Sequence, residues 1–135
     1  MFRFTKQTEY AILALQYITK NKNRLVSAKE IADELEIPFQ FTSKILQQLI
    51  KSNIIESKQG VKGGYKLLKE PKDILITGIM EIFDPSSLQV NCINPINHTV
   101  CKRSGRCNLQ KTVFKIKDEI EKILKNYSIE NAINE

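Results

Sequence analysis

The feature that most constrains the fold is a glycine-rich turn placed directly after three short amphipathic segments. The turn, Gly60-Val61-Lys62-Gly63-Gly64, joins a run that begins at Ile54 to the returning run Tyr65-Lys66-Leu67-Leu68, which is the pattern of a β-hairpin. The three preceding segments carry apolar residues at helical spacing. The sequence therefore predicts a mainly α fold with a small β-wing, a winged helix-turn-helix.

Polar residues mark the start of the predicted helices. Thr5 is a suitable N-cap for the first helix. Ser27 and Glu30 have the spacing of a capping box, in which the hydroxyl accepts from the Glu30 amide and the carboxylate reaches back. Pro38 suits the first turn of the third helix, from about Phe39 to Ser52, because the N–H that proline lacks would have no helical partner there.

The third helix has two contrasting faces. One face gathers apolar residues that we expect to enter the core: Phe39, Ile45, Leu46 and Leu49. The other face is rich in Gln and Lys and carries no carboxylate, which would repel a phosphate backbone. Gln can pair with adenine and Lys with guanine or phosphate, and the second helix of a helix-turn-helix enters the major groove. The candidate DNA contacts on this helix and the wing are Gln40, Ser43, Lys44, Gln47, Gln48, Lys51, Lys58, Gln59 and Lys62.

The charge balance favours a polyanionic partner. The 135 residues include 21 basic and 15 acidic side chains, a net charge of +6. The alternative is an ordinary solvated helix face with a wing that serves packing, but helix, hairpin and charge together favour a double-stranded DNA operator. No apolar run approaches the length of a membrane span, and the N-terminus lacks a signal-peptide pattern, so we expect a cytoplasmic protein.

Beyond the wing, Ile74-Leu75-Ile76 suggests a short strand, and Thr77 is a suitable cap for a helix through Phe83.

The region that follows has no clear period but holds Cys92, Cys101 and Cys107, within sixteen residues. Clustered thiols in a reducing compartment indicate metal or redox chemistry rather than disulfides. Residues 92–107 are called the cysteine segment below.

The chemistry of the cysteine segment leaves alternatives open. Three thiolates can hold an iron–sulfur cluster, either 2Fe-2S or 4Fe-4S, if a fourth ligand is supplied. His98, within the segment, is one candidate for that ligand. The same three cysteines with His98 also make a legitimate tetrahedral zinc set, although no close C-x₂-C pair is present. Three free thiols that sense oxidants are the remaining interpretation.

The C-terminal region has a heptad pattern. Its apolar positions are spaced four, three, four, three and four residues apart, which favours a helix from about 107 to 128 that pairs with a second copy. Packing of this helix on its own domain is the alternative. The chain is thus divided into a DNA-binding domain (1–84), a cysteine loop (85–107) and a dimerisation helix with its tail (108–135). The candidate dimerisation residues are Leu109, Val113, Ile116, Ile120, Ile123 and Tyr127.

Several of these motifs together resemble one bacterial regulator family. They are Thr8-Glu9-Tyr10-Ala11, Ile45-Leu46-Gln47-Gln48-Leu49, the Gly60–Leu67 wing with its Gly-Gly-Tyr, and the three cysteines before the long helix. The resemblance is to the family of the iron–sulfur cluster regulator IscR and the nitric-oxide sensor NsrR, and it covers nearly the whole chain. It implies a homodimer built on the C-terminal helix and a cluster whose state alters DNA affinity.

The resemblance also assigns roles to single residues, with some departures. Glu9 falls where NsrR-like members carry an acidic residue that reaches the partner subunit's cluster, so it is the leading fourth-ligand candidate. Relatives often have Arg where this chain has Gln59, and IscR-type members have His where it has Gln110. Eight residues separate Cys92 from Cys101, whereas relatives often have five.

Together, the sequence predicts a DNA-binding transcriptional repressor that senses cluster, redox or nitric-oxide status. The alternatives are a zinc-stabilised module that binds nucleic acid or protein, and a clusterless thiol-based redox regulator. No enzyme is expected, because the chain has one His, no visible nucleophile–base pairing and no phosphate-cradling loop before a helix.

Overall fold

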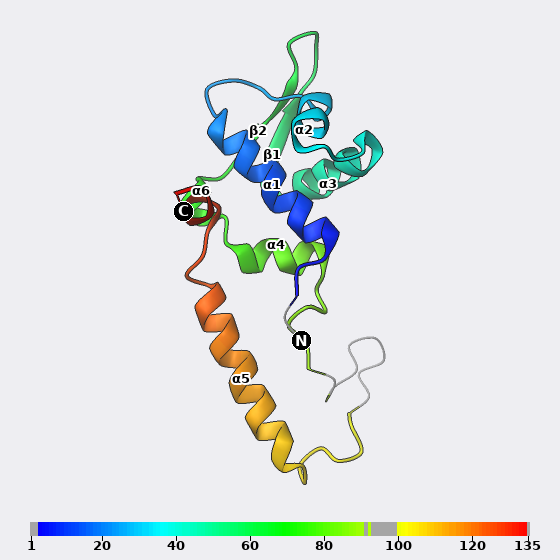
Figure 1. Ribbon diagram of the computed structural model, residues 1–135, viewed down its shortest axis with the longest axis vertical. Coiled ribbons are helices and arrows are strands. Elements are labelled where there is room, and N and C mark those ends of the chain that lie inside the picture. The colour runs from blue at the N-terminus through cyan, green and yellow to red at the C-terminus, as the bar shows by residue number, and fades with distance from the viewer. Residues whose placement is uncertain (1–2, 91, 93–99, 135) are drawn as a thin grey trace.

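The computed structural model describes residues 3–90, 92 and 100–134, which form a head and a stalk (Figure 1). The stalk is α5 (Asn108–Leu124), which runs away from the head and has residues 100–107 at its far end (Figure 1). The fold agrees with the predicted winged helix-turn-helix. The head contains α1 (Lys6–Lys20), α2 (Ala28–Leu35), α3 (Phe39–Lys51), β1 (Ile55–Lys58), β2 (Gly64–Leu67), η1 (Pro71–Asp73), α4 (Ile76–Phe83) and α6 (Ile129–Asn134).

The predicted caps of the first two helices are confirmed. Thr5 Oγ1 accepts a hydrogen bond from the Thr8 amide at 3.3 Å. Ser27 Oγ accepts one from the Glu30 amide at 3.1 Å, which satisfies one of the orphan donors at the start of α2. Pro38 is the residue immediately before α3.

The core of the head is built from one face of each helix. Its side chains include Leu15 of α1, Ile31 of α2, Leu46 of α3 and Ile79 of α4, each at most 1% exposed. Burying one such side chain stabilises the folded state by roughly 1.5–3 kcal/mol, so this shared core stabilises the head. Ile129 of α6 is also fully buried, so the C-terminal end of the chain belongs to this core.

The wing is an antiparallel hairpin anchored on the loop before α2. Val26 and Tyr65 form an isolated bridge, with backbone hydrogen bonds of 3.1 and 2.8 Å. A Cβ on Gly64 would lie 2.7 Å from the Val26 carbonyl oxygen, and one on Gly63 would lie 2.3 Å from that of Lys58. The two glycines are therefore required by close backbone approach, because no side chain fits at either position.

The prediction is wrong for one core residue. Phe39 was expected among the inward residues of the third helix, but its side chain is 55% exposed. Thr42 takes the inward place in the first turn of α3, and its hydroxyl donates to the Pro38 carbonyl oxygen at 3.2 Å. Phe39 is the first residue of α3, so it lies at the end of the apolar stripe, beyond the first buried position at Thr42.

The segment before α4 also differs from the prediction. Residues 74–76 are not a named strand, and α4 begins at Ile76, which leaves Thr77 buried inside the helix rather than at its cap. The extended backbone here pairs with the end of the chain instead. Leu75 bridges Ser128, and the Ile129 amide donates to the Ile74 carbonyl oxygen at 2.9 Å.

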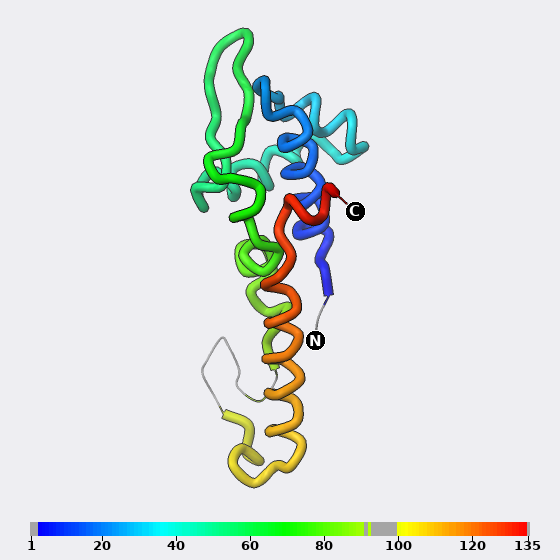
Figure 2. The backbone as a smooth tube through the Cα atoms, turned by 90° about the vertical axis from the view of Figure 1, so that its left-hand side faces the viewer, coloured from blue at the N-terminus to red at the C-terminus, as the bar shows by residue number. Residues whose placement is uncertain are grey.

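The predicted long C-terminal helix is shorter than expected. It ends at Leu124 rather than near residue 128, so Tyr127 lies outside α5. The Ser128 hydroxyl accepts from the Asn131 amide at 3.3 Å and so begins the separate helix α6. Figure 2 shows α6 returned to the head beside α1, where Gln16 Nε2 donates to the Ala132 carbonyl oxygen at 3.1 Å. Capping by Ser128 and burial of Ile129 explain the break.

Candidate nucleic-acid interface and cysteine segment

The polar face of α3 is accessible along its length. Ile45, Leu46 and Leu49 fill the core and hold the opposite face of the helix outward. That outward face carries no carboxylate, as α3 contains none. Ser43 is half-buried, and the other sequence-predicted contacts of the helix are exposed: Gln40, Lys44, Gln47, Gln48 and Lys51.

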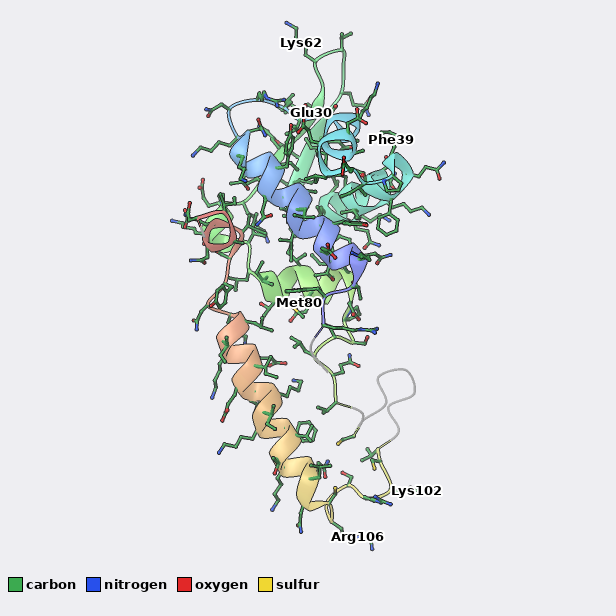
Figure 3. All side chains as sticks on the ribbon, in the orientation of Figure 1. Glu30, Phe39, Lys62, Met80, Lys102 and Arg106 are labelled. Carbon is green, nitrogen blue, oxygen red and sulfur yellow. The ribbon has the colours of Figure 1, made fainter. Side chains whose placement is uncertain are left out.

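The wing extends this basic surface beyond α3. Lys58, Gln59 and Lys62 are all exposed, and Lys62 lies at the tip of the hairpin (Figure 3). Within the wing, Lys66 and Glu56 form an exposed ion pair at 2.9 Å. The hydrogen bond from Lys66 lowers the pKa of Glu56, so this carboxylate stays charged and partnered.

A charged network fixes α2 against α1. Tyr17 Oη donates to Glu30 Oε1 at 2.8 Å, and Arg24 Nη1 donates to Glu30 Oε2 at 3.0 Å. These partners, with the Arg24 guanidinium foremost, lower the pKa of Glu30 to about 2, and the Ser27 backbone amide acts in the same direction. Glu30 therefore joins the end of α1, the connecting loop and α2, which precedes α3 in the helix-turn-helix.

A backbone hydrogen bond links two of the three cysteines, and the third begins the stalk helix. The Cys101 amide donates to the Cys92 carbonyl oxygen at 2.9 Å, and Cys107 is the N-cap residue of α5. All three are free thiols, with Cys101 exposed and the other two partly buried. Gln110 ties the turn between them, because its Oε1 accepts from the Gly105 amide and its Nε2 donates to Ser104 Oγ, each at 3.1 Å.

The donor set suits a thiolate-bound group, but the described side chains do not converge on a ready site. Among the described residues, no three His, Cys, Asp or Glu side chains are grouped closely enough to hold a metal ion. His98 lies outside the described residues. Glu9 is in the first turn of α1, where its carboxylate accepts from Lys6 Nζ at 3.0 Å. Any shared ligation would require the segment to rearrange around the group.

The heptad stripe of α5 is left largely exposed by the part of the chain that the structure describes. No residue of α5 is buried, and the exposed fractions of Leu109, Ile116 and Ile123 are 66%, 49% and 59%. Val113 and Ile120 are partly buried, and Tyr127 is 43% exposed beyond the end of the helix. An apolar stripe of this length on a helix is normally covered by another surface.

Sequence reasoning missed two features of this surface. Phe39 was assigned to the core but lies at the exposed start of α3. Lys29, which is exposed in the first turn of α2, was not among the candidate contacts. The position of Phe39 directly after Pro38, at the very start of α3, was a signal in the sequence that its side chain could lie outside the core.

An exposed basic helix beside an anchored wing defines the class: this is a winged-helix DNA-binding regulator of transcription. Residues 4–135 match the model of the Rrf2 family, described as an iron-dependent transcriptional regulator. The chain therefore belongs to the Rrf2 family, and the resemblance found in the sequence is confirmed. The members of this family are transcriptional regulators and not enzymes, as the sequence predicted for this chain.

Curated relatives match along almost the whole chain. A helix-turn-helix-type transcriptional regulator of Aquifex aeolicus is 30% identical over 131 residues, which cover 97% of this chain and 91% of the relative. The regulator NsrR of Bacillus licheniformis is 30% identical over 133 residues, covering 97% and 92%.

Solved structures share the fold. The global cysteine regulator CymR of B. subtilis superposes with a TM-score of 0.81 at 18% identity, covering 99% of this chain and 98% of that one. IscR of T. potens gives 0.74 at 21%, covering 98% and 87%. None of the described helices combines the length and apolarity needed to cross a membrane.

Proposed function

We propose that this regulator is a homodimeric repressor that reads a partly palindromic operator with α3 and the wing, and that its three cysteines hold an iron–sulfur cluster which tunes the binding. The observation that carries the proposal is the separation of two sites. Lys62 marks the basic reading surface at one end of the molecule, and Lys102 and Arg106 mark the cysteine segment at the other (Figure 3).

The reading surface supports contact with both bases and phosphates. Gln40, Gln47 and Gln48 present amides that can pair with adenine in the major groove. Lys44 and Lys51 flank them as cations for guanine or phosphate, and the wing lysines extend toward the adjacent backbone. The Glu30 network supports the proposed DNA contact because it fixes α2, the helix that precedes α3 in the helix-turn-helix, against α1.

The uncovered stripe of α5 supports a second copy as the partner. Two stalks packed along Leu109, Val113, Ile116, Ile120 and Ile123 would bury apolar surface that one chain leaves in water. A two-fold axis along the stalks would present two heads to DNA, so the operator would carry two related half-sites.

The donor chemistry of the cysteine segment supports a cluster. Thiolates are the usual ligands of iron–sulfur groups, and Cys92, Cys101 and Cys107 would supply three. Cys107 is the N-cap residue of α5, so a group bound to it would lie directly at the start of the stalk. The fourth ligand would come from Glu9 of the other copy, which must first release Lys6, or from His98.

Coupling between the two sites follows from the chain path. α5 connects the cysteine segment to α6, and α6 packs on α1 of the head. Holding the three thiols together would fix the segment at the start of the stalk, and releasing them would allow the heads to change spacing or tilt. The switch requires only that the cluster be bound more tightly in one arrangement than in the other.

The test is anaerobic purification and reconstitution with iron and sulfide. We expect iron, acid-labile sulfide and visible absorption in the wild type, and their loss in Cys101→Ala and Cys107→Ala. Val100→Ala is the matched control, because it shortens an exposed side chain of the same segment but removes no thiol. Stoichiometric zinc without sulfide, or colourless protein whose DNA affinity responds only to oxidants, would contradict the cluster.

A further inference from the structure

Phe39 is a large apolar side chain exposed on an otherwise polar reading surface. It is 55% exposed at the first position of α3. Phe41, two residues later, is instead packed edge-on against Tyr10, with ring centroids 5.5 Å apart. The inward positions of α3 are filled by Thr42, Ile45 and Leu46, so packing of the head does not account for Phe39.

The surroundings of Phe39 suit a polyanion. It lines a groove between the start of α2 and the wing, together with Lys29, Lys58 and Gln59. Both lysines are exposed, and the described residues that line this groove include no carboxylate. In Figure 3, Phe39 lies at the outer side of α3, on the part of the head that also carries the wing. The two lysines make the groove positively charged. The phosphates of a nucleic-acid strand suit this charge better than an apolar surface on a second copy of the chain would.

We propose that Phe39 is a specificity-determining residue that contacts the 5-methyl group of a thymine in the operator. The N-terminal residues of a recognition helix face base edges in the major groove. The thymine methyl is the apolar group displayed there, and phenylalanine is among the side chains that contact it. Lys29 and Lys58 would hold the phosphates of the strand that lies in the groove.

The expected effect is small but specific. Withdrawing one methyl group from water against an aromatic ring should strengthen binding about fourfold. Replacing that thymine by deoxyuridine, which lacks only the methyl, should therefore weaken wild-type binding about fourfold at one position of each half-site. Because Phe39 is exposed, Phe39→Ala should keep the fold, which circular dichroism would verify.

The experiment measures affinity by fluorescence anisotropy on a selected operator in which each thymine is replaced singly by deoxyuridine. Wild type should show one sensitive position per half-site, Phe39→Leu should retain most of the preference, and Phe39→Ala should lose it. Leu68→Ala is the control, because it removes an exposed apolar side chain, 50% accessible, away from this groove. Equal thymine-to-uracil ratios in wild type and Phe39→Ala would overturn the inference.

The inference rests on the proposed operator binding, and the two fail differently. If no duplex is preferred over random competitor, the proposed function itself is wrong. If a specific duplex is bound but has no methyl-sensitive thymine, only the role of Phe39 is wrong. A shift of Phe39→Ala from dimer to monomer in sedimentation would assign the residue to contact between copies and would likewise overturn it.

Discussion

The head and the stalk of this regulator use apolar residues in opposite ways. In the head, Leu46 and Leu49 are completely buried, whereas in the stalk no residue of α5 is buried and Leu109 is 66% exposed. The head therefore holds the stability of a folded unit within one chain. The described residues leave the apolar stripe of the stalk largely exposed, so the stripe would be buried only if a further surface packed on it.

The polar interactions show the same contrast. In the head, hydrogen bonds join residues that are distant in sequence, such as Tyr17 with Glu30 and Gln16 with Ala132. In the cysteine segment, the described contacts mostly join near neighbours, such as Gln110 with Ser104 and Gly105. A region held by short-range bonds can change shape at lower cost, and this is what a sensing segment requires.

The largest expected effect is on the core of the head. Leu46→Ala should lower the free energy of unfolding by about 2–5 kcal/mol, because it leaves a cavity in a close-packed core. Ile116→Ala, on the stalk, should cost less and only at protein concentrations where copies associate. Denaturant titration at two protein concentrations would measure both. Equal, concentration-independent losses would erase the contrast between the two regions.

The next effect concerns assembly. Ile116→Lys places a charge in the middle of the stripe and should weaken self-association at least tenfold, while the far-ultraviolet circular dichroism of the head is retained. Asp118→Lys adds a lysine on the opposite face of α5 and is the matched control. Sedimentation velocity at micromolar concentration would distinguish them. A wild-type monomer, or an unchanged Ile116→Lys dimer, would contradict the second-copy proposal.

A third effect sharpens the description of the reading surface. Lys44→Ala combined with Lys51→Ala should weaken binding to all duplexes about tenfold and reduce the slope of log affinity against log salt by about 2, if each lysine neutralises one phosphate. Binding would be titrated at two salt concentrations. The charge-matched control Lys122→Ala with Lys125→Ala removes two lysines from the stalk region and should leave the slope unchanged.

The smallest effect is on the Glu30 network. Glu30→Gln should lower the free energy of unfolding at pH 7 by about 0.5–1 kcal/mol, since the pair is only partly buried. The pKa of Glu30 is about 2 in the folded chain, below its ordinary 4.5, so its contribution is complete above pH 4.5 and is lost as the pH falls toward 2. A difference between variant and wild type that persists at pH 2 would argue against this assignment.

Much of the head could be predicted because its signals are local. The Ser27 hydroxyl caps α2 through the nearby Glu30 amide, and Gly63 is required by the nearby Lys58 carbonyl, as the capping box and the glycine turn indicated. The need for Gly64 is not local, because its close neighbour is Val26. Phe39 was misassigned because periodicity places residues on a face without showing which one will fill the first turn. Thr42 fills it instead.

The remaining errors and gaps are long-range. The end of α5 at Leu124 depends on Ile129 reaching the core of the head, which the heptad spacing does not encode. The bridge of Leu75 with Ser128 likewise joins distant parts of the chain. For the site, the sequence located the basic surface and the thiols, but their spacing does not determine a fourth ligand, which depends on a second copy or on the bound group.

The most direct test of the account compares the operator affinity of the reconstituted and the cluster-stripped protein, measured anaerobically at fixed salt by fluorescence anisotropy. We expect the wild type to differ at least fivefold between the two states and Cys107→Ala to show the same affinity under both treatments. Identical affinities of the two wild-type states, with the cluster demonstrably present in one, would contradict the claim that the far end of the stalk controls the reading heads.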